Sequence, residues 1–162
     1  MKISDGVEWG IHCAVLLGFL EPGASLPTAR LAEYHGVPGA YLAKHLQAMS
    51  KAGILVSVQG AGGGYRLARP AAQVSVLDVV EAIDGREPAF RCAEIRRRGP
   101  AARPAREYRV PCAIHAVMDR ADEAWRDELR AVSIADLMAR VVAGASPKGL
   151  EQGAQWMEVV LR

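Results

Sequence analysis

Apolar residues recur along most of this chain every three or four positions, which is the spacing of amphipathic helices. The pattern is longest over residues 111–131 and predicts one long helix there. Turn and capping residues divide the remaining pattern into shorter pieces. Together these signals predict helices over residues 5–20, 27–34, 39–52, 76–83, 111–131, 133–144 and 150–161.

Three of these helices have recognisable starts. Asp5 with Glu8 has the residue types and spacing of an N-cap and its reciprocal partner, and Ser133 with Asp136 has the same pattern. Ser75 is expected to cap the helix that follows it. The glycine-bounded stretch over residues 144–149 is expected to be a linker before the last helix.

One stretch departs from the helical pattern. Residues 54–58 and 65–67 are short runs of strand-forming residues, and residues 60–64 between them are rich in glycine, which adopts positive φ at little cost. These runs predict a β-hairpin. Two helices, a tight turn and a hairpin follow one another in the order of a winged helix-turn-helix, so the expected fold is mostly α with a β-hairpin wing.

In a winged helix-turn-helix the second helix of the pair enters the major groove of DNA. Small residues at its start permit close approach, and the slim hairpin tip fits a minor groove. The alternative is a helical domain with an ordinary glycine-rich loop, although this loop lacks the lysine and hydroxyl residue of a phosphate-binding loop. The candidate DNA-binding residues are Thr28, Gly39, Ala40, Tyr41, Lys44, Gln59, Gly60, Gly63, Gly64, Tyr65 and Arg66.

Composition narrows the class of protein. The net charge of the 162 residues is only +2, so bulk charge does not by itself indicate a nucleic-acid partner. The three cysteines argue against a disulfide scaffold and for a reducing, cytoplasmic location. The longest apolar run, residues 11–20, is too short to span a bilayer and lacks the flanks of a signal peptide. No catalytic triad or paired-carboxylate signature indicates an enzyme.

Cys92 and Cys112 bracket nineteen residues that are rich in arginine and proline. Two thiols are too few for a metal centre, because zinc and iron–sulfur sites usually take four protein ligands. Seven arginines between Arg91 and Pro111 are expected to favour the thiolate form electrostatically, or to form a solvated loop that improves attraction to DNA.

Several motifs in this order resemble the Rrf-two family of dimeric winged-helix transcription regulators, over about residues 1–143. The motifs are Tyr41-Leu42-Ala43-Lys44, Leu46, Ala52-Gly53-Ile54-Leu55, residues 60–67 and residues 77–83. The resemblance implies a homodimer formed through the long helix, and an iron–sulfur cluster in the loop before it. It divides the chain into a DNA-binding domain (1–86), a sensor loop (87–111), dimerisation helices (112–143), and a linker with a C-terminal helix (144–162).

Cluster-binding members of the family usually have three cysteines in that loop, whereas this chain has two. A [2Fe–2S] cluster can be held by two cysteines and two other donors. Glu8 and His12, at i and i+4 of the first predicted helix, project from one face and are the favoured pair. The sequence around them, and the wide spacing of the two thiols, resemble the redox-sensing RsrR type of the family, in which this helix reaches the loop of the partner subunit.

His115 and Cys13 are less favoured ligands. His115 follows the second thiol at a position where some family members have a histidine ligand, and Cys13 is expected to be a buried small apolar residue. Two other interpretations stay open: a zinc-binding module that uses both thiols, and a clusterless regulator whose loop binds a small effector or simply folds.

Overall fold

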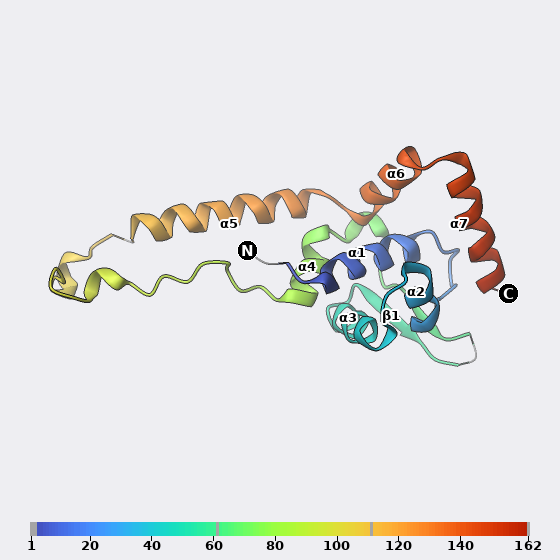
Figure 1. Ribbon diagram of the computed structural model, residues 1–162, viewed down its shortest axis with the longest axis horizontal. Helices are drawn as coiled ribbons and strands as arrows, with labels where there is room; N and C mark the ends of the chain where they lie inside the picture. Colours follow the sequence, from blue (N-terminus) through green and yellow to red (C-terminus); the bar gives the residue numbers. More distant parts are fainter. Residues whose placement is uncertain (1–2, 61, 111, 162) are drawn as a thin grey trace. The chain divides into compact units, whose positions relative to one another are not determined.

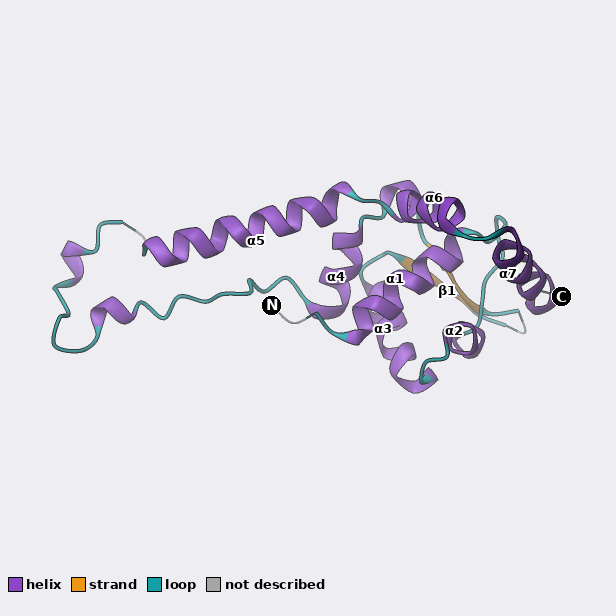
Figure 2. Ribbon diagram, turned by 45° about the horizontal axis from the view of Figure 1, so that its top comes forward, coloured by secondary structure: helices purple, strands orange, loops and turns teal. Residues whose placement is uncertain are grey.

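The computed structural model describes residues 3–60, 62–110 and 112–161. Arg86–Glu128 form one compact unit, and the segments on either side of it in the chain form a second, larger unit. The elements in chain order, shown in Figures 1 and 2, are α1 (Asp5–Gly18), α2 (Thr28–His35), α3 (Gly39–Lys51), β1 (Leu55–Val58), β2 (Gly64–Leu67), α4 (Val76–Asp84), α5 (Ala113–Ala131), α6 (Ile134–Gly144) and α7 (Pro147–Val160), with short 3₁₀ turns at Ala71–Gln73, Ile95–Arg97 and Ala105–Glu107.

The core of the larger unit is built around α1, which buries Gly6, Val7 and Gly10 in its first half and every residue from Cys13 to Leu17 in its second. Leu42, Leu46 and Met49 of α3 are fully buried in the same apolar cluster. Burying a side chain of this size stabilises a fold by roughly 1.5–3 kcal/mol. Because the three residues lie on one face of α3, its opposite face is directed away from the core.

The predicted cap of α1 is wrong. Helix α1 begins at Asp5, so the cap position belongs to Ser4 and both Asp5 and Glu8 lie inside the first turn. Ser4 makes no side-chain bond to the helix, because its N–H and its hydroxyl both donate to the carboxylate of Asp84 at the end of α4. The start of α1 is therefore tied to α4, and the Glu8 side chain is not needed for a capping box.

The predicted hairpin is confirmed, with Leu55 opposite Leu67 and Val58 opposite Gly64 in an antiparallel pair. Leu26 adds a bridge that the sequence did not indicate, because its N–H and C=O both bond to the backbone of Tyr65. A Cβ atom at Gly64 would lie 2.6 Å from the backbone nitrogen of Pro27, so glycine is required there for close approach.

The predicted caps at Ser75 and Ser133 are confirmed as complete capping boxes, with Asp78 and Asp136 as their partners. The expected linker over residues 144–149 is wrong in its extent. Helix α6 continues to Gly144 and α7 already begins at Pro147, since proline is well suited to the first helical position.

The smaller unit contains the cysteine-bracketed segment and most of α5. The segment is largely irregular, as expected, but contains the two 3₁₀ turns at Ile95–Arg97 and Ala105–Glu107. Helix α5 has no buried residue, and Ile114, Val117 and Met118 expose an apolar stripe at helical spacing.

Candidate functional site

The first turns of α3 present the predicted recognition surface. Tyr41 is 67% exposed, Ala40 and Lys44 are exposed, and Gly39 is half-buried at the first position of the helix. Ala40, Tyr41 and Lys44 lie on the side of α3 opposite its buried leucines. A phenol and an ammonium on one exposed helix face can contact base edges and phosphates.

The wing presents a second polar surface. Gln59, Gly60 and Arg66 are exposed, and Gly60 has a φ of 107°, in the region that favours glycine. The Ser25 hydroxyl donates to the carbonyl of Gly62 at 2.8 Å, which anchors the turn.

Four other predicted DNA-binding residues are half-buried: Thr28, Gly63, Gly64 and Tyr65. Tyr65 packs against the core and bonds through its backbone to Leu26, while Gly63 leaves no room for a Cβ beside the carbonyl of Val58. Thr28 is the first residue of α2. Half-buried residues of this kind can support the shape of a DNA-binding surface, but they expose little area for direct contact with DNA.

Glu8 and His12 are both exposed on α1 and line one small cavity of about 200 Å³ with Trp9, His35 and Val37. The centroids of the His12 and His35 rings are 5.6 Å apart. Burial lowers the pKa of His35, and the nearby His12 lowers it further. His35 Nε2 is buried without a hydrogen-bond partner among the described residues. The expected pair therefore lines a cavity with a second imidazole, that of His35, beside His12.

Cys92 and Cys112 are brought into one electrostatic environment in the smaller unit. The thiol of Cys92 accepts a hydrogen bond of 3.4 Å from the backbone N–H of Glu94. Backbone N–H groups of His115 and Ile114 lower the pKa of Cys112, and the charge of Arg96 lowers it further. The hydrogen bond to Glu94 raises the pKa of Arg96 most, and the charges of both thiols raise it further, so one guanidinium interacts with both thiols.

Glu94 and Tyr108 organise the loop around that guanidinium. Glu94 has φ 47°, an unusual conformation for a residue other than glycine, and its carboxylate accepts two hydrogen bonds from Arg96, one of 2.9 Å. The Arg96 guanidinium lies 5.1 Å from the centroid of the Tyr108 ring, and the Tyr108 hydroxyl donates to the backbone carbonyl of Arg96. The loop thus holds Arg96 from two sides.

The two less favoured ligands have other surroundings. His115 lies in the smaller unit, where its Nε2 is 3.2 Å from Asp119 and its Nδ1 has no partner in the described ranges. Cys13 is completely buried in the core, and burial raises the pKa of its thiol to about 12. Since metal ligation needs the thiolate, this environment disfavours Cys13 as a ligand.

The predicted ligands thus form two pairs, with Glu8 and His12 in the larger unit and both loop thiols in the smaller. Nowhere in the described ranges do three histidine, cysteine or acidic side chains of the single chain gather closely enough to hold a metal ion. The chemistry of the thiol pair nevertheless fits a thiolate-ligated group, because backbone N–H donors and a guanidinium surround it.

Sequence reasoning missed His35, Tyr108 and the role of Glu94. The signal for His35 was weak, since it lies 23 positions after His12 and on another helix. The signal for Tyr108 was available, because an aromatic residue among arginines indicates cation–π contacts. The positive φ of Glu94 has no sequence signature.

Comparison with known proteins gives consistent matches. The model of the family described as Rrf2, iron-dependent transcriptional regulator, matches residues 3–140. The HTH-type transcriptional regulator YwgB of Bacillus subtilis (strain 168) is 27% identical over 141 residues, which are 87% of this chain and 86% of that protein. The HTH-type transcriptional regulator IscR of Cronobacter sakazakii is 37% identical over 92 residues, 57% of each chain.

The fold is also similar to that of a solved structure. CymR (YrzC), the global cysteine regulator of B. subtilis, superposes with a TM-score of 0.69 at 18% identity, over 86% of this chain and 98% of that one. At this identity the likeness establishes the architecture, which is that of a winged-helix regulator. In the described segments, no helix is both long and apolar enough to cross a membrane.

Proposed function

The chain belongs to the Rrf2 family of transcriptional regulators and is a DNA-binding regulator, and from this premise we propose that it senses redox state or cluster assembly through a [2Fe–2S] cluster. The observation that supports the proposal most is the environment of Cys92 and Cys112. Backbone N–H groups and Arg96 lower the pKa of Cys112, which favours its thiolate, the form that ligates metals, and Cys92 lies near the same guanidinium and accepts one backbone N–H group.

We propose Glu8 and His12 as the other two ligands. Both are exposed on one face of α1, one helical turn apart, so an approaching group can meet both. In a homodimer these two donors can come from the partner subunit, as the resemblance to RsrR-type proteins implies. If each cluster takes its two thiols from one subunit and Glu8 and His12 from the other, the four ligands need not lie together within a single chain.

A bound [2Fe–2S] cluster supplies one-electron chemistry and negative charge. Arg96 balances charge at the thiols. Glu8 and His12 connect the site to α1, whose buried face packs in the same core as α2 and α3. A change of ligation at α1 then shifts the helix-turn-helix between arrangements with different affinity for DNA.

We propose that dimerisation uses the apolar stripe of α5, formed by Ile114, Val117 and Met118. A symmetric dimer places two recognition helices on two half-sites of an operator, and the spacing of the half-sites follows from the dimer geometry. The expected location is cytoplasmic, where free thiols persist.

The test is anaerobic purification with iron and acid-labile sulfide counts and visible spectra. We expect near-equal iron and sulfide. Glu8→Ala and His12→Ala should alter the spectrum, while His115→Ala leaves it unchanged. If the first two variants match the parent and His115→Ala differs, the ligand set is wrong. Colourless protein without iron would favour the clusterless regulator, and zinc without sulfide would favour the zinc-binding one.

A further inference from the structure

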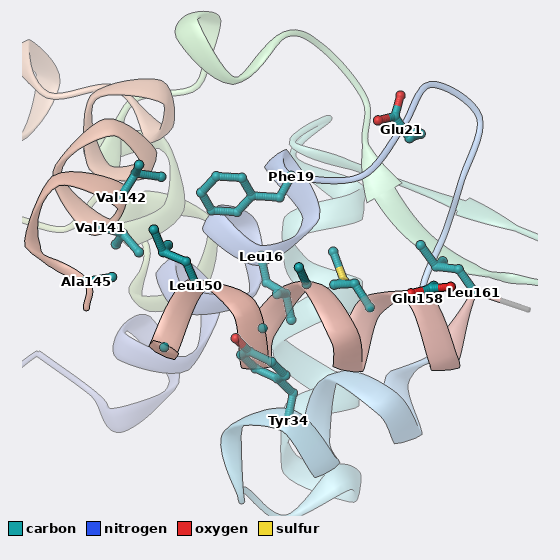
Figure 3. A pocket seen from close by; sticks show the side chains of 14 residues that line it. Leu16, Phe19, Glu21, Tyr34, Val141, Val142, Ala145, Leu150, Glu158 and Leu161 are labelled. Carbon is teal, nitrogen blue, oxygen red and sulfur yellow. The ribbon is translucent and has the colours of Figure 1, made fainter. Parts of the chain in front are cut away.

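The larger unit contains an apolar hollow of about 570 Å³ against α7, with Phe19, Val142 and Leu150 on its walls (Figure 3). The carboxylates among its described lining residues, those of Glu21 and Glu158, come from the loop after α1 and from near the end of α7, and they do not converge on one point. The hollow therefore has no arrangement of polar groups that would select a ligand. In the smaller unit, by contrast, charged side chains of α5 converge on the backbone that leads to the thiols.

Asp122 and Arg126 of α5 are those charged side chains. Arg126 Nε donates to the Asp122 carboxylate at 2.7 Å, and the Arg126 and Asp122 side chains are only 16% and 13% exposed, on a helix that has no buried residue. The other oxygen of Asp122 accepts a bond of 3.4 Å from the N–H of Ala89, and Arg126 Nη2 donates to the carbonyl of Arg86 at 3.1 Å. The hydrogen bond from Arg126 is the largest cause that holds the pKa of Asp122 below its usual range, and the N–H of Ala89 lowers it further. The ion pair is therefore fastened to the main chain after α4.

Residues 86–90 follow α5 in the reverse direction, through three successive contacts: Arg86 with Arg126, Ala89 with Asp122, and the Phe90 ring with that of His115, whose centroid is 6.2 Å away. At about 100° per residue, the three α5 positions fall within about 40° of one another around the helix. The segment therefore lies along a single face of α5. In Figure 1 the chain then runs on toward the start of α5 and turns back there.

This register limits where Cys92 can lie. Cys92 is three residues after Ala89, and three extended residues span about 10 Å. Cys112 directly precedes α5, about 15 Å of helix before Asp122. A chain that is fastened at Asp122 and lies beside His115 therefore keeps Cys92 within reach of the start of the helix, where Cys112 is.

We propose, resting on the function proposed above, that Asp122 and Arg126 are positioning residues for the thiol pair. By fixing the register of residues 86–90 on α5, they hold Cys92 close to Cys112, so that one group can take both thiols as ligands. Both members of the ion pair are needed, because removing one leaves the other charge shielded without its partner.

The test uses the full chain, freed of metal by a chelator, in glutathione redox buffers. One molecule of oxidised glutathione converts the two thiols into a disulfide and leaves two molecules of reduced glutathione, so the equilibrium constant reports the effective concentration of Cys92 at Cys112. Non-reducing gels and peptide mapping identify the disulfide within one chain. We expect Asp122→Ala and Arg126→Ala each to lower this constant about tenfold. The double variant should lower it no further, because the two residues act as a unit.

Two further variants separate positioning from a general effect. Asp122→Asn keeps an oxygen that accepts from Ala89 and should retain most of the parental constant. Glu123→Ala is the matched control, because it removes the same charge from the next, exposed position, about 100° away around the helix, and it should behave as the parent does. Circular dichroism measures whether each variant keeps its helix.

An unchanged constant in Asp122→Ala, or an equal fall in Glu123→Ala, would overturn the proposal. So would a parental constant no higher than the one measured in concentrated urea. A fall in Asp122→Ala that comes with lost helix, and that Asp122→Asn shares, would show a role in the stability of α5 alone and would also overturn it.

Cluster-loaded protein separates this proposal from the proposed function. If the parent binds a cluster, Asp122→Ala should lose it to a chelator about tenfold faster than the parent, while Glu123→Ala loses it at the parental rate. An unchanged rate in Asp122→Ala would overturn the proposal. If the parent binds no cluster, the proposed function fails, and the glutathione measurement still decides whether the ion pair positions the thiols.

Discussion

The imidazole rings of His12 and His35 lie 5.6 Å apart, one on α1 and the other at the end of α2. Burial lowers the pKa of His35, and the charge that His12 can acquire lowers it further. A candidate ligand on α1 is thus electrostatically coupled to the helix that precedes the recognition helix. This coupling is measurable without any knowledge of the operator.

The first prediction concerns that pair in cluster-free protein. His12→Ala should raise the pKa of His35, because the coulombic part of the shift disappears. The value should stay below the ordinary 6.5, since burial remains the larger cause. Two-dimensional NMR of the ring protons across pH measures it. His115→Ala is the control and should leave the titration of His35 unchanged. If the pKa of His35 in His12→Ala equals that in the parent, the two imidazoles are not coupled.

The same shift has a consequence for stability. A histidine whose pKa is lowered on folding binds protons more readily in the unfolded state, so the free energy of unfolding decreases as pH falls through about 6.5 and on toward the folded value. His35→Gln should therefore flatten the acid side of the stability profile relative to the parent, as measured by urea unfolding at a series of pH values.

The second prediction concerns the loop thiols. Backbone N–H groups lower the pKa of Cys112 most, and Arg96 lowers it further. Arg96→Gln should raise that pKa in part and slow alkylation by iodoacetamide at pH below the ordinary thiol value. Peptide mapping of the alkylated protein identifies the cysteine. Arg103→Gln, at a position that is 72% exposed, is the matched control and should react at the parental rate; equal slowing in both variants would indicate a general charge effect.

Much of the fold was predictable because its signals are local. The caps at Ser75 and Ser133 and the glycine-rich turn of the hairpin depend on neighbours a few residues away, and the caps and the hairpin were predicted correctly. The cap of α1 was mispredicted because Ser4 is engaged by Asp84, 80 positions later. Long-range contacts of this kind leave no periodic signal in a single sequence.

The residues of the candidate site also divide into those that local sequence signals indicate and those that only tertiary packing brings together. Cys92, Cys112 and the i, i+4 pair of Glu8 and His12 were visible as residue types and spacing. The placement of His35 beside His12 depends on how α1 packs on α2, and is a tertiary property.

A third prediction tests the wing. Gly64→Ala should lower the free energy of unfolding by about 2 kcal/mol or more, because its Cβ would meet the backbone at Leu26 and Pro27, which cannot move without breaking the bridge to Tyr65. Urea unfolding checks the stability. Gly62→Ala, where a Cβ meets nothing within 4 Å, is the control and should change stability little. Similar losses in both variants would contradict the close-approach argument.

A fourth prediction tests the proposed dimer helix. Val117 is 54% exposed in the apolar stripe of α5. Val117→Glu should convert a dimer into monomer, since a charge in a buried apolar interface is costly. Light scattering after size-exclusion chromatography measures the mass. Glu123→Lys changes a charge on the other side of the same helix and should leave the dimer intact. A dimeric Val117→Glu protein would place the interface elsewhere.

The last prediction tests the recognition helix with a duplex selected from random sequence by the parent protein. Lys44 is exposed near the start of α3, and Lys51 is exposed at its last residue. If Lys44 contacts a phosphate, Lys44→Ala should weaken binding and reduce the slope of log affinity against log salt by about one. Lys51→Ala is the matched control and should keep the parental slope, because the base-contacting residues of a recognition helix lie toward its N-terminus. Fluorescence anisotropy at several salt concentrations distinguishes the two. A parental slope in Lys44→Ala, with a reduced slope in Lys51→Ala, would mean that the other end of α3 meets the DNA.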